Sequence, residues 1–162
     1  MRVIKDSSII EDNWQRIDQI DNEQSLPDGD VIVPFGYWLA NREVLSNRNS
    51  GVGVCINGDV ETEEVAMDLD HFSIIALEFP KFTDGRSYSH ARLLRDRYGF
   101  KGELRAVGDV LRDQLFFMQR CGIDSYELRE DKDIEDAMNA FSEITIKYQS
   151  AADCPEPAYK SR

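Results

Sequence analysis

The chain has 162 residues, of which 41% are hydrophobic, and it carries a formal net charge of −12. This length suits one soluble domain with a substantial core, and no apolar run approaches the roughly 18 residues of a membrane-spanning helix. A strongly acidic chain repels nucleic acid and anionic membranes, so neither is expected as a partner. The N-terminus lacks the apolar segment of a signal peptide, so we expect a cytoplasmic protein.

The cysteines argue against several kinds of cofactor. Cys55, Cys121 and Cys154 are odd in number and widely spaced, with no Cys-x-x-Cys pair among them. We therefore expect no metal site, no iron–sulfur cluster, no disulfide framework and no cofactor. Cys55 and Cys121 are interpreted as small apolar residues in a reducing compartment.

The first 30 residues are polar and predict a small β-hairpin extension, with strands near residues 3–4 and 9–17. An apolar run at 31–35 predicts the next strand, which Pro34 should confine to a sheet edge because proline cannot donate a backbone hydrogen bond. A helix is then predicted over residues 38–47.

From residue 52 onward, predicted strands and helices alternate. The strands are 52–56, 73–79, 103–107, 125–129 and a terminal 144–148; the helices begin at Thr62, cover 88–98, follow an Asp109 cap over 110–121, and cover 133–141. This alternation predicts an α/β domain over residues 31–148. Its mainly parallel sheet of four to five strands, with flanking helices, is either an open sheet or a half-barrel. The polar residues 149–162 predict a disordered acidic tail.

The turn at residues 78–92 joins a predicted strand to a predicted helix and is dense in polar side chains. Free backbone N–H groups at a helix start favour a bound anion, and an arginine can offer two donors to one oxyanion. In the alternative interpretation, Asp84 and Arg86 only hold the turn in place. The predicted anion-binding residues are Lys81, Thr83, Gly85, Arg86, Ser87 and Arg92.

Charge is distributed unevenly along the chain. Residues 78–120 contain nine Lys and Arg against six Asp and Glu, a charge of +3 in a chain that is otherwise −15. Such an island suits a small anion or an acidic patch on another protein; alternatively, its arginines only solvate a helix. Arg112, Phe116 and Arg120 share one helical face and are the predicted partner-docking residues.

Candidate groups for acid–base chemistry stand at the predicted strand ends. Glu78, Asp84 and Asp109 are the catalytic candidates, because parallel strands bring the loops after them to one edge of a sheet. The loops 57–59 and 130–131 should lie at the same edge. His90, in the first turn of a helix, is interpreted either as a neutral base or as a half-exposed residue without function. No nucleotide-binding or nucleophile motif is present.

One set of motifs is long enough to support a resemblance: EFPKFTDGR (78–86), YS (88–89), ARLLR (91–95), RYG (97–99), GELRAVGDVLRDQLFF (102–117) and RCG (120–122). With these motifs the chain resembles, over about residues 30 to 148, one bacterial family of unknown function that is often labelled an oxidoreductase. Genes of that family commonly stand beside those for the assimilatory sulfite reductase haemoprotein. The tail after residue 149 lies outside the resemblance.

The resemblance implies an accessory protein of sulfite reduction in sulfur assimilation. The resemblance supplies no established catalytic residue. In our leading hypothesis the basic residues Lys81, Arg86 and Arg92 hold a small anion, such as sulfite or a sirohaem carboxylate, or dock onto the sulfite reductase haemoprotein. A small oxidoreductase or other α/β enzyme that uses the 78–92 turn as its active site is the alternative, and an electron-carrying redox partner is a third. Whether the chain forms a homodimer is left open.

Overall fold

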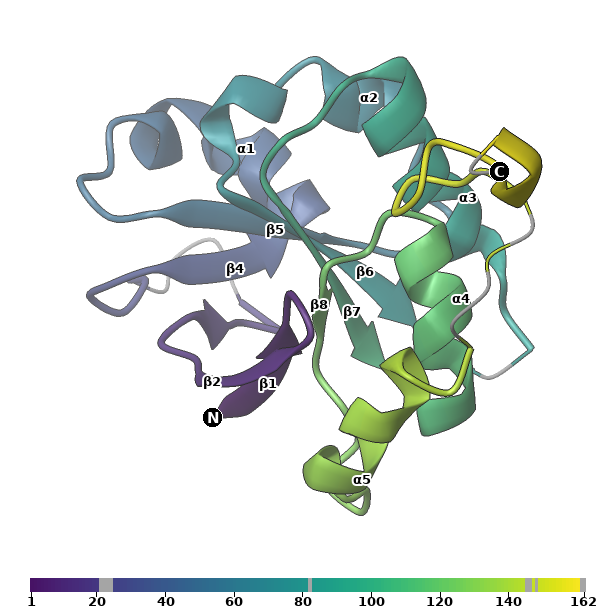
Figure 1. The fold of residues 1–162 in the computed structure, drawn as a ribbon. Coiled ribbons are helices and arrows are strands. Elements are labelled where there is room, and N and C mark those ends of the chain that lie inside the picture. The colour runs from purple at the N-terminus through teal and green to yellow at the C-terminus, as the bar shows by residue number, and fades with distance from the viewer. Residues whose placement is uncertain (21–24, 82, 145–146, 148, 161–162) are drawn as a thin grey trace.

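The computed structural model describes residues 1–20, 25–81, 83–144, 147 and 149–160. It has an α/β fold (Figure 1). Its strands are β1 (Arg2–Lys5), β2 (Ser8–Glu11), β3 (Gln15–Arg16), β4 (Val31–Pro34), β5 (Val52–Ile56), β6 (Ile74–Phe79), β7 (Glu103–Gly108) and β8 (Ser125–Tyr126). Its α-helices are α1 (Phe35–Ser46), α2 (Thr62–Ala66), α3 (Arg86–Arg92), α4 (Leu115–Arg120) and α5 (Ile134–Met138).

All eight strands belong to one sheet, in the order β2-β1-β8-β7-β6-β5-β4-β3. The strands from β3 to β8 pair in parallel, which confirms the predicted parallel order of the four central strands. The predicted count of four to five was wrong, because the N-terminal hairpin joins the sheet. Strand β1 pairs antiparallel with both β2 and β8, and β3 pairs with β4, so the sheet is mixed.

Chain connectivity forces the sheet to curl. Strands β2 and β3 lie at opposite ends of the sheet order, yet only residues 12–14 separate them. Such a connection spans at most about 14 Å, whereas eight strands laid flat would place these two roughly 34 Å apart. The sheet is therefore a curled half-barrel that stays open between β2 and β3, one of the two predicted architectures.

The curled sheet has two different faces. Its convex face packs against the helices in the main core, around Trp38, Leu77 and Leu94. Figure 1 shows α1 to α4 on that side, with the purple N-terminal strands on the other side between β4 and β8. The concave face has a small apolar cluster of Ile32, Ile74, Ala76 and Val107, against which Trp14 and Cys55 pack. The rest of that face is polar.

Several predicted elements differ from the structure at their ends. The helix predicted over 88–98 is α3 followed by a π-helical segment, η2 (Leu93–Arg97). The helix predicted over 110–121 is a 3₁₀ turn, η3 (Arg112–Gln114), followed by α4. Its N-cap residue is Leu111, so the predicted Asp109 cap was wrong. Further 3₁₀ turns are η1 (Leu69–His71), η4 (Asn139–Phe141) and η5 (Ala158–Lys160).

The strand predicted over 125–129 is only the two-residue β8, and the predicted strand 144–148 lies largely outside the described residues. Pro34 occupies the end of β4, beyond the part of that strand that pairs with β3, so its missing N–H breaks no bond there. No helix within the described ranges is long and apolar enough to cross a membrane.

Part of the C-terminal segment, for which composition predicts a disordered tail, contacts α4 in the structure. The Asp153 side chain is 9% exposed and pairs with Arg120 at 2.8 Å and with Lys147. The backbone N–H of Ala152 donates to the Arg120 carbonyl at 3.3 Å. Composition alone could not reveal this placement, because it depends on a cation that another element supplies.

Candidate functional site

The loops that follow the strands meet at the carboxyl edge of the sheet, as predicted. Arg86, at the start of α3, pairs with Asp59 in the loop after β5. Arg129, beyond β8, donates to Asp109 after β7 at 2.9 Å. Gly58 lies directly under the Arg86 guanidinium, and a Cβ atom at position 58 would collide with it. This edge therefore brings together charged side chains from loops far apart in the sequence.

The Arg86 side chain is held by two carboxylates. Its Nε and Nη2 donate to Asp84 at 3.0 and 2.8 Å, and its Nη1 donates to Asp59. Hydrogen bonds from Arg86 lower the pKa of Asp84 to about 2. The three groups together carry one net negative charge, so the cluster itself does not attract a free anion. Arg86 remains 52% exposed, which leaves it accessible to a partner.

The other predicted anion-binding residues do not converge on one point. The Ser87 hydroxyl is buried and donates to the Glu78 carbonyl at 2.6 Å. Arg92 pairs with Asp96 at 2.7 Å, one helical turn away. Lys81, Thr83 and Gly85 are exposed, and no contact of the Lys81 ammonium occurs among the described side chains. A small anion would find Lys81 and Thr83 available but would have to displace carboxylates from the arginines.

The predicted docking face on α4 is occupied by the chain itself. Arg120 is paired with Asp153, and the Lys147 ammonium lies 5.8 Å from the centre of the Phe116 ring. Arg112 pairs with Asp136 at 3.0 Å and also with Glu143. The adjacent Phe117 is instead 56% exposed. Phe116 itself is half-buried, so the predicted docking role of this face stays a prediction.

His90 is buried, not half-exposed as one interpretation expected. Its Nδ1 lies 2.7 Å from the Thr62 hydroxyl, which links α3 to α2. Burial lowers its pKa, although a hydrogen bond with the Gly58 backbone acts in the opposite direction. The imidazole is thus a neutral group inside the protein, behind the Arg86 cluster, and its position favours a structural role over direct contact with a substrate.

A cavity opens at the carboxyl ends of β4, β5 and β6. We call it the carboxyl-edge cavity; it has a volume of about 490 Å³ and is lined by Arg16, Ile17, Asp18, Gln19, Pro34, Phe35, Gly36, Cys55, Asn57, Val60 and Glu78. Half-barrels and other parallel α/β folds bind ligands at this edge. Of the three catalytic candidates, Glu78 lines the cavity, whereas Asp84 and Asp109 are engaged by arginines.

Two charged residues bridge the concave face beside this cavity. Arg16 on β3 donates to Glu127, just beyond β8, at 3.0 Å, and to Asp18 at 2.6 Å. Strands β3 and β8 are at opposite ends of the parallel part of the sheet, so the Arg16–Glu127 ion pair stabilises its curvature. The enclosed atoms Arg16 Nε and Glu127 Oε2 have no hydrogen-bond partner among the described residues.

A comparison with known families accounts for most of the sequence. The family described as "Bacterial protein of unknown function (DUF934)" matches residues 53–159. The chain belongs to this family. No curated protein and no solved structure matches the chain. The match includes most of the C-terminal segment, which corrects our expectation that the tail lies outside the family resemblance. It also leaves out the N-terminal strands that supply Arg16.

Sequence reasoning missed three residues of this region: Arg16, Cys55 and Glu127. Arg16 was assigned to a separate hairpin extension, and Glu127 to the middle of a longer strand. The available signal was alternation: in strands, every second residue faces the same side, which places Cys55, Glu78 and Glu127 on the concave face. Burial raises the pKa of the Cys55 thiol to about 12, with a smaller contribution from Glu78. The thiol is therefore not a nucleophile at neutral pH.

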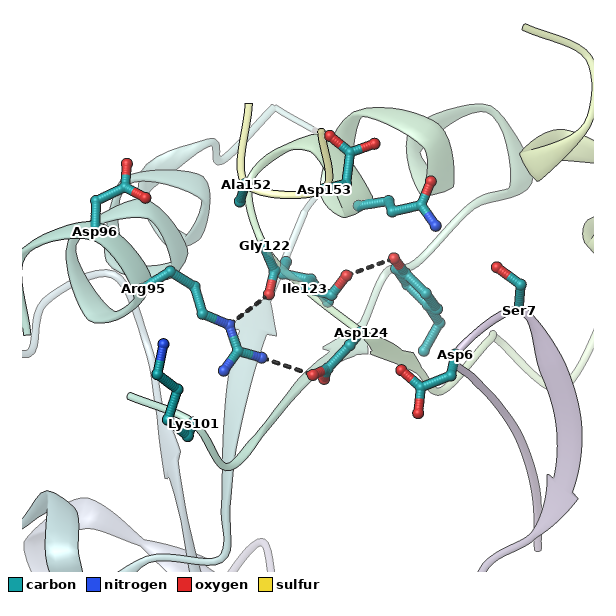
Figure 2. Close-up of a pocket in the computed structure, with 12 residues that line it drawn as sticks. Asp6, Ser7, Arg95, Asp96, Lys101, Gly122, Ile123, Asp124, Ala152 and Asp153 are labelled. Atoms are coloured by element: carbon teal, nitrogen blue, oxygen red, sulfur yellow. Dashed lines mark hydrogen bonds and ion pairs between the residues drawn. The ribbon is translucent and has the colours of Figure 1, made fainter. Parts of the chain in front are cut away.

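A second cavity, of about 460 Å³, lies at the amino ends of β7 and β8. Figure 2 shows Arg95 reaching across it to the Gly122 carbonyl and the Asp124 carboxylate, at 2.9 and 2.6 Å. Arg95 also donates to the carbonyls of Phe100 and Gly102. These four hydrogen bonds connect the turn at residues 100–102 to the turn at residues 122–124, which indicates a structural role for Arg95.

Within the part of the chain that the structure describes, no group of three or more His, Cys, Asp or Glu side chains is arranged to hold a metal ion. The +3 window predicted from charge counting is not a free basic patch. Arg92 pairs with Asp96 inside the window, and the other six arginines pair with carboxylates from other parts of the chain: Asp12, Asp59, Glu63, Asp124, Asp136, Glu143 and Asp153.

Proposed function

We propose that this protein is an accessory protein of sulfite reduction in bacterial sulfur assimilation, and that it acts in the cytoplasm by docking onto the sulfite reductase haemoprotein. The link to sulfite reduction comes from the sequence resemblance, because genes of the resembled family commonly stand beside those for that reductase. The choice of docking over anion binding comes from the surface of α3 and α4.

The observation that supports docking is an exposed aromatic residue held in a fixed position. Phe117 on α4 is 56% exposed, and its ring centre lies 5.0 Å from that of Tyr88 on α3. Tyr88 in turn contacts Phe79 at the end of β6, also at 5.0 Å. Arg92, one turn after Tyr88, is 41% exposed. Rigid aromatic rings beside an arginine are the usual anchors of protein interfaces.

Electrostatics favour the same choice. At the 78–92 turn, Arg86 and Arg92 already have carboxylate partners, so a small anion gains little there. A partner protein whose surface carries both acidic and basic side chains can instead pair with the arginines and with their carboxylates. In this proposal Lys81, Arg86 and Arg92 form the polar border of a docking surface centred on Tyr88 and Phe117.

Co-purification of the two proteins tests the proposal. The wild-type protein, tagged and mixed with the haemoprotein of its own organism, should form a complex, and Phe117→Ala should weaken it by about tenfold or more. Val44→Ala is the matched control, since Val44 is a 74% exposed apolar residue on the distant helix α1. Absence of a complex between the wild-type proteins would reject docking.

A deletion strain gives the functional readout. It should grow poorly on sulfate or sulfite and normally on sulfide. The gene carrying Phe117→Ala should fail to restore growth, whereas the Val44→Ala gene should restore it. Normal growth of the deletion strain on sulfite would contradict any role in sulfite reduction.

The second candidate function is a small enzyme, an oxidoreductase or other α/β enzyme. The observation in its favour is Glu78, whose carboxylate lines the carboxyl-edge cavity and has no hydrogen bond or ion pair with any described residue. Glu78→Gln would then abolish growth on sulfite while leaving the complex with the haemoprotein intact. A visible absorption band in the purified protein would favour an electron carrier instead.

A further inference from the structure

The carboxyl-edge cavity has a chemistry of its own, distinct from the docking surface on α3 and α4. We propose that it is a binding site for an organic cation, an alkylammonium or alkylguanidinium group, with Glu78 as the counter-ion. Such a group is found in small amines and in lysine and arginine side chains. The inference does not depend on the proposed docking function.

The charges around the cavity favour a cation. Arg16 is the one cationic side chain that lines it among the described residues, and two carboxylates already share its guanidinium: Asp18 and Glu127. Glu78 adds a third carboxylate, which no described residue neutralises. One positive charge therefore stands among three negative charges. A cation entering the cavity gains Coulomb energy, and an anion is repelled.

The walls suit an alkyl chain behind the charged group. Ile17, Pro34, Phe35 and Val60 contribute apolar surface next to the carboxylates. Apolar walls with a few well-placed polar groups are characteristic of small-ligand sites. A volume of about 490 Å³ accommodates a four-carbon chain with its head group and accompanying water.

Other ligand classes fit this cavity less well. Burial and, further, Glu78 raise the pKa of the Cys55 thiol to about 12, which disfavours a nucleophilic role for Cys55. That influence of Glu78 also indicates that its charge is felt inside the cavity. A phosphate, sulfate or sulfite ion would need donors, and Arg16, the one arginine among the described residues of the wall, has its Nη atoms engaged by carboxylates. An organic cation can pair with Glu78 without displacing an existing contact.

Titration of the full-length protein with n-butylguanidinium tests the site. Calorimetry should show saturable binding, and amide resonances of Cys55, Asn57 and Glu78 should shift. Butyrate and n-butanol, which have the same chain with a negative or no charge, should bind at least about tenfold more weakly. Equal binding of butanol, stronger binding of butyrate, or no binding of butylguanidinium would each overturn the proposal.

Two variants locate the binding. Glu78→Gln keeps the shape of the side chain and should weaken butylguanidinium binding by about tenfold. Glu130→Gln is the matched control, because Glu130 is exposed in the loop after β8, at the same edge, and does not line the cavity. Unchanged binding in Glu78→Gln, or an equal loss in Glu130→Gln, would show that the cation binds elsewhere.

Gly36→Leu, the second of the two variants, fills the cavity and leaves every charged residue in place. Gly36 lines the cavity near the start of α1, and a Cβ atom there meets nothing within 4 Å. Gly36→Leu should therefore fold normally and block butylguanidinium. If a folded Gly36→Leu protein bound the cation as the wild type does, the cavity would not be the site.

Competition identifies the source of the cation. If butylguanidinium displaces the sulfite reductase haemoprotein, the natural occupant is a lysine or arginine side chain of that partner. If the protein binds both at once, or does not bind the haemoprotein at all, the occupant is a free amine or guanidine. The last result would reject the docking function and leave the cation site standing.

Discussion

Two arginine–carboxylate clusters lie on the concave face of the curled sheet, and they differ in how completely their polar atoms are paired. Arg105 on β7 is 1% exposed; it forms two hydrogen bonds with Asp12, at 2.7 and 2.9 Å, and pairs with Glu103 at 2.8 Å. Arg16, at the carboxyl edge, is 25% exposed, and its Nε has no partner among the described residues.

The difference follows from where the chain crosses the half-barrel. Residues 12–14 pass from β2 to β3, and Asp12 of this connection pairs with Arg105 in a cluster that is almost fully buried, where only full pairing makes the charges tolerable. The Arg16 cluster lies beside the carboxyl-edge cavity, and its side chains are less deeply buried, although Arg16 Nε and Glu127 Oε2 are enclosed and lack partners among the described residues. The covered end of the concave face therefore serves the fold, and the open end is available for function.

The largest expected effect comes from breaking the covered cluster. Arg105→Met would leave the buried Asp12 without its cation and Glu103 with Lys5 alone, so we expect the free energy of unfolding to fall by about 3–5 kcal/mol. Urea unfolding of both proteins measures this. Adding Asp12→Leu to the Met variant should recover part of the loss, because it removes the unpaired Asp12 charge. A loss below about 1 kcal/mol would mean that water reaches the cluster.

The covered cluster should also make stability depend on pH. Burial acts to raise the pKa of Glu103, but hydrogen bonds and charges from Lys5 and Arg105 outweigh it and leave the pKa below its ordinary value of 4.5. The ionised carboxylate thus stabilises the folded state above about pH 4.5, and this contribution is lost as the pH falls through the lowered pKa.

Unfolding measured between pH 7 and pH 3 checks the sign. The wild-type protein should lose more stability over this range than Glu103→Gln, which cannot titrate at that position. Parallel curves for the two proteins would show that Glu103 has the same pKa in the folded and unfolded states.

A smaller effect is expected at the open end. Arg16→Gln removes the bridge to Glu127 across the concave face, but both side chains retain some contact with solvent. We expect a loss of roughly 1 kcal/mol in the free energy of unfolding, as for a partly exposed ion pair. A loss equal to that of Arg105→Met would indicate that the two ends of the concave face are equally enclosed, and the distinction between a covered end and an open end would then be wrong.

The sequence predicted the central, local part of this fold well. Alternation of apolar runs with capped amphipathic segments located β5, β6 and β7 to within one residue at each end, and parallel strand order then placed Asp59 and Arg86 at one edge. These features depend on periodicity and on connection rules that act over short stretches of chain.

What the sequence could not predict depends on contacts between distant residues. Charge counting over 78–120 suggested a basic patch, but Arg105 meets Asp12 and Arg120 meets Asp153, each across a long separation in the chain. The hairpin was assigned to a separate extension, because nothing local reveals that β1 pairs with β8. The carboxyl-edge cavity could not be predicted for the same reason, since Arg16 lines it only because the sheet curls.

The smallest expected effect concerns the electrostatics of the open end, and it requires no unfolding. Glu78 raises the pKa of the Cys55 thiol, although burial is the larger cause. Glu78→Gln should therefore lower the pKa of Cys55 while leaving it above the ordinary value of 9.0. The rate of Cys55 alkylation by iodoacetamide, followed against pH in a protein whose Cys121 and Cys154 are replaced by alanine, measures the shift.

The same measurement with Glu103→Gln is the control, because Glu103 lies at the covered end and is neutralised by Lys5 and Arg105. An unchanged profile in Glu78→Gln would mean that the Glu78 charge is screened by solvent, and the open end would then lack the negative potential on which cation binding depends.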